Sequence, residues 1–366
     1  MKKVTSFIPL LFCLWTFGQT PANDPHWQLV WEDNFNSLNT TIWKVANHFD
    51  HYGGEPQVYT NRTDNVFISN GSLVLRAKKE IYNCPSGSIN QWDCVRQYNT
   101  GQPYNYTSGW IETKQAYNTQ YGYIESRIKL PHGYGFWPAF WTFAGAGITA
   151  TNAAEIDIFE MLGSDSLSPN IMGTNIHKYY CDNCPAPSYC ECSQLYQPAC
   201  PWENPDILCY GQDLIPYGFD YTDWNTYAIE WTPSKIIWYV NNYPVRIFPN
   251  PGIVDPVRII LNFAIDPWIP PNQSTPFPSD MYIDYVKVYD IRKDCNTNLN
   301  VCNYNFSTHD NKVKKSITIG NGTCTNALNV GQNVFLRATE SVLINGDFTV
   351  PVGAQLSIHM DENTCP

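Results

Sequence analysis

The chain has 366 residues, enough for one large domain and a small second one. Lysine and arginine total 22 against 33 aspartates and glutamates, a formal net charge of −11 that speaks against binding to nucleic-acid phosphates. Charged residues make up only 15% of the chain, below the roughly 25% of ordinary soluble proteins, and aromatic residues are equally frequent. This composition suits a secreted β protein that offers ring faces to an uncharged ligand, although strands favour aromatic residues in any case.

The first residues have the pattern of a secretory signal. Lys2 and Lys3 precede the apolar run Ile8–Phe17, and the small residue Gly18 follows it. We expect residues 1–19 to be a signal peptide, because the run is too short to span a membrane permanently. No later stretch is apolar and long enough to cross a bilayer. The mature protein is therefore expected to be secreted, to have no membrane partner and to act as a monomer.

Residues 24–291 are expected to form one all-β domain. From His26 to Asp290 apolar and polar residues alternate in short stretches, which clusters of Gly, Pro and Asn separate, and no long amphipathic helix is evident. Many short strands in one domain of this size predict a sandwich or a barrel. Clear examples of such strands lie at 65–77, 122–130, 227–246 and 281–289.

Three carboxylates lie close together in the middle of this domain. Regular alternation places Glu155 and Asp157 on one face of a strand, whereas it turns Glu160 to the other face, beside two isoleucines. A charge buried there without a partner would be costly. One extra residue near Ile158 and Phe159, a β-bulge, would return Glu160 to the face of the other two acids. The sequence therefore predicts a row of three acids along a cleft.

Thirteen cysteines are present, and Cys13 lies in the predicted signal, which leaves an even number. In a secreted chain this predicts disulfides. Cys84 and Cys94 are near enough in sequence to close a short loop. Cys181 and Cys184 have a spacing that also begins zinc sites, but secretion and the lack of a matching second pair favour disulfides. The remaining cysteines are Cys190, Cys192, Cys200, Cys209, Cys295, Cys302, Cys324 and Cys365.

The composition changes after the all-β domain. Residues 292–315 are polar and rich in Asn, and we expect them to be a linker. Short alternating runs return in 316–366, which predicts a small β module without a catalytic pattern. Anchoring and polysaccharide binding are both open as roles for this module.

The acid row resembles the signature of glycoside hydrolase family 16, in the bulged form E-x-D-x-x-E that is found in laminarinases. Other stretches of the chain also resemble the family and occur in the family's order, at 27–35, 55–59, 108–113, 121–141, 227–231 and 283–289. The resemblance implies a β-jelly-roll sandwich of the concanavalin A-like type, with an open cleft on its concave sheet. The C-terminal module lies outside the resemblance.

The resemblance also implies roles for the three acids. Glu155 matches the nucleophile, Glu160 the general acid and base, and Asp157 the assisting acid between them. Glycoside hydrolysis with retention needs two carboxyl groups about 5–5.5 Å apart beside the scissile bond. Crowded carboxylates cannot all ionise freely, which keeps a proton available for the leaving group. No cofactor is expected for catalysis. The alternative is an edge strand with ordinary solvated acids.

Five further residues match substrate-binding positions of the family. They are Trp137, Trp141, Glu55, Arg127 and His177. Indole rings pack on the C–H faces of sugars, and the two tryptophans share one face of a strand, but either could instead belong to the core. Arg127 could equally neutralise the acid row from a buried position. A lone histidine is otherwise most often structural.

Glu32, Gly71 and Asp284 match positions that hold a structural Ca²⁺ on the convex face of relatives. Calcium takes carboxylate and backbone carbonyl oxygens, so a glycine can contribute a ligand. Three unrelated surface residues are the alternative reading of these positions.

The resemblance predicts a secreted, endo-acting, retaining hydrolase of β-1,3-glucans such as laminarin, because hydrolases of mixed-linkage glucan typically lack the bulge. One departure concerns 262–271, where laminarinases usually carry a Gly-Gly segment. Mixed-linkage glucan and the marine galactans agarose, porphyran and carrageenan therefore stay open as substrates, although the negative charge of the chain speaks against sulfated ones. A glucan-binding lectin is a further alternative, which the presence of Glu155 and Glu160 disfavours.

Overall fold

A computed structural model describes residues 27–51, 54–145, 153–161, 171–178, 213–214, 220–233, 235–291, 297–306, 309–330 and 332–360. The predicted signal peptide lies outside the described residues, as do Cys181, Cys184, Cys295 and Cys365. Within the described part of the chain, no helix is long and apolar enough to cross a membrane.

The larger of the two main sheets has ten strands, and all its neighbouring strands are antiparallel except β3 and β6. Strands β1 (Trp27–Asp33) and β4 (Val66–Ser69) join it beside β17 and β5. The other strands follow in the spatial order β15 (Tyr243–Pro249), β14 (Lys235–Val240), β13 (Asn225–Trp231), β8 (Gly122–Lys129), β17 (Ser279–Ile291), β5 (Ser72–Tyr82), β6 (Tyr104–Ser108) and β3 (Gln57–Tyr59).

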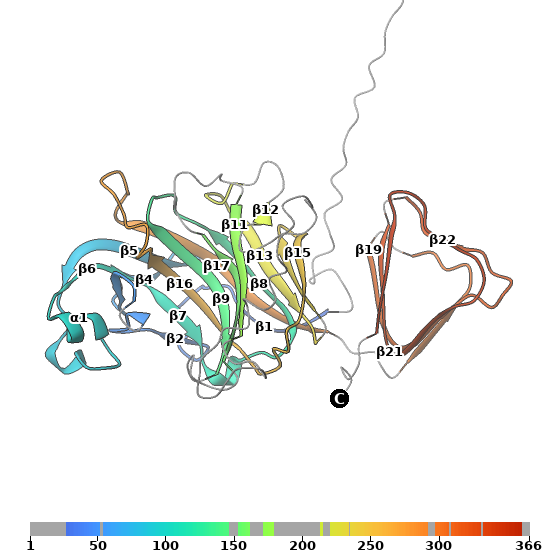
Figure 1. Cartoon of the computed structure of the whole chain (residues 1–366), viewed down its shortest axis with the longest axis horizontal. Coiled ribbons are helices and arrows are strands. Elements are labelled where there is room, and N and C mark those ends of the chain that lie inside the picture. The colour runs from blue at the N-terminus through green and yellow to red at the C-terminus, as the bar shows by residue number, and fades with distance from the viewer. Residues whose placement is uncertain are drawn as a thin grey trace, which may run out of the picture.

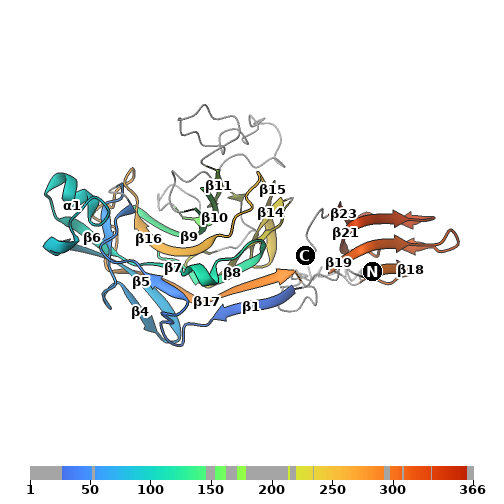
Figure 2. The same cartoon turned by 90° about the horizontal axis from the view of Figure 1, so that it is seen from below.

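The second main sheet has seven antiparallel strands and lies over the first (Figures 1 and 2). Its spatial order is β12 (Asp213–Leu214), β11 (Ile171–Lys178), β10 (Ala154–Glu160), β9 (Phe136–Ala144), β16 (Arg258–Ile265), β7 (Trp110–Thr113) and β2 (Trp43–Val45). The predicted acid row occupies β10, near the middle of this sheet. The predicted all-β sandwich is thereby confirmed.

One large apolar core fills the space between the two sheets. Ile156 of β10 and Ile259 of β16 contribute to it from the seven-stranded sheet, and Ile124 of β8 and Ile229 of β13 from the ten-stranded sheet. All four side chains are fully buried. Because side chains alternate along a strand, the residues between them point away from the core. We call the side of the seven-stranded sheet that is turned away from the core its outer face.

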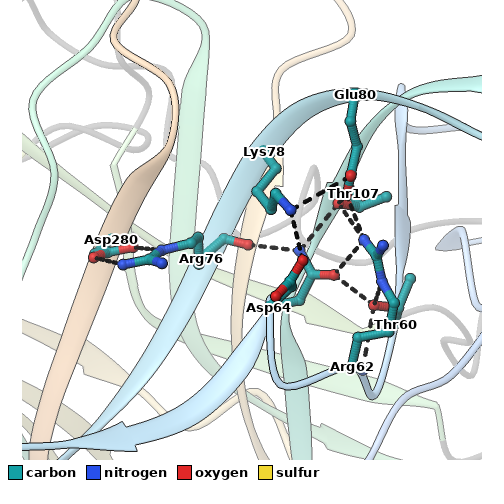
Figure 3. A network of polar contacts seen from close by, with 9 residues as sticks. Thr60, Arg62, Asp64, Arg76, Lys78, Glu80, Thr107 and Asp280 are labelled. Atoms are coloured by element: carbon teal, nitrogen blue, oxygen red, sulfur yellow. Dashed lines mark hydrogen bonds and ion pairs between the residues drawn. The ribbon is translucent and has the colours of Figure 1, made fainter.

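A disulfide and a network of polar contacts stabilise the part of the sandwich around β5 and β6. The disulfide Cys84–Cys94 closes the predicted short loop. This loop carries the helical turn η3 (Ser86–Ser88) and leads into helix α1 (Val95–Thr100). A further helical turn, η4 (Gln115–Tyr117), follows β7. A network of ion pairs and hydrogen bonds joins β5 to its neighbours, and Arg62 contacts four other side chains in it (Figure 3). Its labelled members are Thr60, Arg62, Asp64, Arg76, Lys78, Glu80, Thr107 and Asp280.

The C-terminal part forms separate small sheets with a core of their own (Figure 1). Strands β18 (Asn298–Val301), β19 (His309–Ile319), β21 (Asn333–Ile344) and β23 (Gln355–Met360) pair in parallel, as do β20 (Asn326–Ala327) and β22 (Phe348–Thr349). Parallel pairing of successive segments indicates a stack of coils. Strand β18 and the start of β19 lie within 292–315, the range predicted as a linker. The division into domains stays a prediction.

Candidate active site

Strand β10 carries the acid row and pairs with β9 on one side and β11 on the other. Glu155 lies opposite His177 of β11, and Asp157 lies opposite Trp141 of β9. Residues that face each other in neighbouring strands point to the same side of a sheet. These four side chains therefore share the outer face of the seven-stranded sheet.

The pairing of β10 shifts directly after Asp157. Ile158 and Phe159 together face the single residue Thr174 of β11, and both of their side chains are buried in the core. Two residues opposite one define a β-bulge. Beyond it, Glu160 lies opposite Ala139 of β9, on the outer face that Glu155 and Asp157 also occupy. The predicted bulge is confirmed, and it prevents the burial of Glu160 among apolar side chains.

Asp157 is the most buried of the three acids and is only 1% exposed. Its Oδ2 lies 3.3 Å from Nε2 of His177, which in turn lies 2.9 Å from the Asn175 side-chain amide. Burial raises the pKa of Asp157 and the charge of Glu160 raises it further, whereas His177 lowers it. Asp157 therefore holds a proton more readily than an ordinary aspartate does.

Glu160 is partly buried and accepts a hydrogen bond of 3.0 Å from the indole Nε1 of Trp137. Burial and the charge of Glu155 raise the pKa of Glu160 to about 7, although His177 and the Trp137 hydrogen bond act in the opposite direction. A carboxyl group with this pKa is still largely protonated in mildly acidic water. It can therefore donate a proton that an ordinary glutamate would already have lost.

The three acids and the histidine form one connected group. One carboxylate oxygen each of Glu155 and Asp157 and one ring nitrogen of His177 all lie within 4.8 Å of one another. Asp157 is also within hydrogen-bonding reach of both Glu155 and Glu160. Two carboxylates and an imidazole this close can share either a metal ion or a proton. The raised pKa values of Asp157 and Glu160 suit acid–base chemistry.

The two predicted stacking tryptophans have different environments, although both lie on β9. Trp141 is only 8% exposed; its indole donates to Asn262 at 2.7 Å and packs edge-on against Trp110. Trp137 is partly exposed and lies 5.5 Å from the ring of Trp268. Trp137 thus offers a ring face beside the acid row, whereas Trp141 lies mostly within a cluster of aromatic side chains.

Glu55 is buried near this aromatic cluster. It accepts a hydrogen bond of 2.8 Å from the hydroxyl of Tyr59 and another from Gln57, and it lies 3.3 Å from Nδ1 of His51. Burial lowers the pKa of His51, but the hydrogen bond and charge of Glu55, together with the charges of other nearby carboxylates, outweigh burial, so that the pKa is raised overall. The charge of Glu155 raises it as well. Glu55 therefore acts on the site through His51, which the sequence did not single out.

The structure does not bring Arg127 to the acid row. Its neighbours Ile124 and Ile128 on β8 point into the core, so Arg127 points away from the core on the ten-stranded sheet. There its guanidinium binds Asp284 at 2.8 Å and lies over the ring of Trp224 at 4.9 Å. The predictions of a substrate-binding or acid-neutralising Arg127 are corrected accordingly. Arg127 forms an ion pair with Asp284 instead, a residue far from it in the sequence.

The three predicted calcium ligands lie around the point where β17 exchanges its partner β5 for β1. The carboxylate of Asp284 is paired with Arg127, and that of Glu32 lies 3.6 Å from Nζ of Lys287. Gly71 occupies a tight turn with a positive φ. Because both carboxylates already have cationic partners, their side chains do not offer the free donor set that calcium takes. Calcium binding stays a prediction, and no chemical step below depends on it.

Several residues of the outer face were not predicted. Asn175 shares the strand face of His177 two positions away, a relationship that the period of a strand would have indicated. Trp268 is 75% exposed beside Trp137, in the loop that replaces the Gly-Gly segment of laminarinases. Tyr59 and Asn262 reach the site through hydrogen bonds between segments far apart in sequence, for which the sequence holds no local signal.

A two-sheet β sandwich with three adjacent acids on the outer face of one sheet has the arrangement that a glycoside hydrolase requires. The model of Glycosyl hydrolases family 16 matches residues 54–184 and 212–287, more than half of the chain, and the protein belongs to this family. The predicted family is thereby confirmed.

Named relatives and solved structures agree with this assignment. The chain is 27% identical over 316 residues to the "Beta-glucanase" of Rhodothermus marinus, covering 79% of this chain and 95% of that protein. The laminarinase catalytic domain of Thermotoga maritima superimposes with a TM-score of 0.55 at 28% identity, covering 72% of this chain and 98% of that domain. The "Kappa-carrageenase" of Pseudoalteromonas carrageenovora is 27% identical over 217 residues, which are 57% of this chain and 48% of that protein. The match to the Thermotoga structure confirms the predicted jelly roll.

Proposed function

We propose that this protein is an endo-acting, retaining hydrolase that cuts β-1,3-glucan by double displacement. The observation that carries the proposal is the bulge in β10, which places Glu160 on the same face as Glu155 with Asp157 between them. Retention requires a nucleophile and an acid on the same stretch of surface, close enough to act on one glycosidic bond.

In the first step the carboxylate of Glu155 attacks the anomeric carbon, and Glu160 gives its proton to the glycosidic oxygen. The bond between this carbon and oxygen breaks, the leaving sugar departs as an alcohol, and a glycosyl ester forms on Glu155. The pKa of about 7 keeps Glu160 protonated for this step up to near-neutral pH. Trp137 holds the carboxyl group in place through its indole N–H.

In the second step Glu160, now a carboxylate, takes a proton from water while the water oxygen attacks the anomeric carbon. The ester breaks, Glu155 is released as a carboxylate, and Glu160 is protonated again. Asp157 lies within hydrogen-bonding reach of both glutamates, and a negative charge on it would be unfavourable beside theirs. His177, whose Nε2 lies 3.3 Å from Oδ2 of Asp157, limits how far the pKa of Asp157 rises.

Two arguments support a β-1,3-glucan as the substrate. The bulged spacing of the acids resembles that of laminarinases, and the similar proteins include a beta-glucanase and a laminarinase by their printed names. The ring faces of Trp137 and Trp268 suit an uncharged sugar chain that packs its C–H faces on indole. The acidic net charge of −11 disfavours a polyanionic chain.

A galactan is the second candidate. The loop Asp266–Pro271 takes the place of a Gly-Gly segment, and it presents an exposed tryptophan instead of bare backbone. Asp266 accepts hydrogen bonds from the backbone N–H groups of Trp268 and Ile269, which stiffens the loop. A kappa-carrageenase at 27% identity shows that a chain this similar can act on a different polysaccharide.

A substrate screen with the purified protein tests the proposal. Laminarin, lichenan, agarose, porphyran and carrageenan are incubated separately, and the linkage of the products is determined. We expect internal cleavage of laminarin; cleavage of agarose or carrageenan alone would replace the glucan by a galactan. Following the released anomer by proton NMR tests retention, because an inverted anomer appearing first contradicts double displacement.

The variant Glu155→Gln separates an enzyme from a glucan-binding lectin. We expect it to retain binding to laminarin and to lose hydrolysis, because the amide cannot act as the nucleophile. Hydrolysis that persists in this variant would refute the role of Glu155. A wild-type protein that binds but does not cut any polysaccharide would favour the lectin.

We further propose that the protein works outside the cell. The disulfides Cys84–Cys94 and Cys302–Cys324 support an oxidising compartment, as does the N-terminal signal pattern. Recovery of the protein from the culture medium, with an N-terminus near Gly18, is the expected result when residues 1–366 are expressed in an exporting host.

A further inference from the structure

Two polar side chains of the ten-stranded sheet face the seven-stranded sheet: one is buried in the apolar core, and the other is half-buried on the edge strand β15. Trp238 of β14 and Arg246 of β15 lie directly opposite each other in the pairing of these strands. The indole of Trp238 is fully buried, and the guanidinium carbon of Arg246 lies 5.0 Å from the centroid of its ring. They form a stacked pair in which the position of one restricts the other.

Both side chains reach from the ten-stranded sheet to the backbone at the bulge of β10. Nε1 of Trp238 donates a hydrogen bond of 2.7 Å to the carbonyl oxygen of Asp157, the residue directly before the bulge. Nη1 of Arg246 lies 2.8 Å from both the carbonyl oxygen and Oγ1 of Thr174, the residue that faces the bulge from β11. From the opposite sheet, the pair therefore bonds to the backbone of both strands that form the bulge, β10 and β11.

The physical reason lies in the hydrogen-bond ladder. A bulge locally disrupts the regular pairing between strands, and a buried carbonyl oxygen needs a donor. Asp157 and Thr174 are both buried, so water cannot readily supply these donors. Donors from the opposite sheet satisfy the backbone at this point and make the bulged arrangement the stable one.

We propose that Trp238 and Arg246 are positioning residues, a brace that holds the bulge of β10 and thereby sets the place of Glu160 relative to Glu155. This inference rests on the proposed function, since it assigns the brace to the retaining reaction. Neither residue touches the substrate. A displacement of reacting groups by about 1 Å can lower the rate of an enzyme by about 100-fold. We expect the brace to control the separation of the Glu155 and Glu160 carboxyl groups in this way.

The variant Trp238→Phe removes the N–H donor and keeps most of the buried ring. We expect kcat to fall by about 10- to 100-fold while KM changes by less than about twofold, because the substrate-contacting side chains remain. The charge of Glu155 helps to raise the pKa of Glu160, so a loosened bulge lowers that pKa. The alkaline limb of the pH–rate profile therefore moves to lower pH.

Trp231→Phe is the matched control. Trp231 of β13 is equally buried in the same core, and its indole N–H makes no hydrogen bond among the described residues. The same substitution there removes a similar volume but no bond to the catalytic strand. We expect a loss of thermal stability with unchanged kcat and an unchanged pH profile. Equal changes in kcat and pH profile for Trp238→Phe and Trp231→Phe would show that Trp238 only contributes to the stability of the core, and would overturn the inference.

Arg246→Met tests the other half of the brace, and it should move kcat and the alkaline limb in the same direction as Trp238→Phe. A readout without substrate keeps the inference separate from the proposed function. The carboxyl carbon of Glu160 is titrated by NMR in the wild type and the variants. A lower midpoint in Trp238→Phe but not in Trp231→Phe supports the brace even when the polysaccharide screen fails. An unchanged midpoint in both brace variants refutes it.

Discussion

The hydrogen bond between Trp137 and Glu160 allows a prediction with a definite sign. Trp137→Phe removes the N–H donor that lies 3.0 Å from the Glu160 carboxylate and keeps a ring of similar width. Because this bond favours the charged form, its loss raises the pKa of Glu160. A hydrogen bond to a charged group contributes about 1.5–3 kcal/mol, and about half of that remains at a partly exposed position. At about 1.4 kcal/mol per unit, the pKa rises by roughly one unit.

The assay is the pH dependence of kcat/KM on the polysaccharide that the wild type cuts. We expect its alkaline limb to move up by about one pH unit from the wild-type position near the Glu160 pKa of about 7. Trp141→Phe is the control, because its indole binds Asn262 instead, so that its activity falls without a shift of this limb. A limb that stays in place or moves down in Trp137→Phe would show that the indole does not set the Glu160 pKa.

Three further outcomes are expected. His177→Ala removes a ring that lowers the pKa of Glu160, so the alkaline limb moves to higher pH and kcat falls; an unshifted limb would contradict this role. Replacing Cys84 and Cys94 together by serine opens a loop with a sequence separation of 10 and lowers the free energy of unfolding by about 3 kcal/mol, as urea denaturation measures; an unchanged midpoint would refute the estimate. Trp268→Ala raises KM severalfold for long oligosaccharides and much less for short ones, whereas Trp268→Phe retains most of the affinity; equal effects at all chain lengths would argue against stacking.

The acid row shows what local sequence determines. Alternation along a strand and the cost of a buried charge were sufficient to predict that Glu160 lies on the face of Glu155 and that an extra residue near Ile158 makes this so. Both statements concern residues within one strand, and they hold in the structure. The all-β class and the Cys84–Cys94 disulfide were predictable for the same reason, since each depends on neighbours in sequence.

The tertiary structure decided which neighbours each of these residues meets. Trp137 and Trp141 share one strand and one face, yet Asn262 and Trp110 cover the second of them from other strands. The sequence likewise placed Arg127 on a strand, but the assembly of the sheets turned it to the side away from the acid row.

The support of the bulge is the clearest case. Trp238 reaches Asp157 across 81 positions of the chain, and Arg246 reaches Thr174 across 72. Period and spacing describe one strand at a time, whereas these contacts depend on how two sheets stack. The sequence by itself therefore determined the presence and order of the acids and the need for a bulge. Only the packing of one sheet on the other decided what holds that bulge in place.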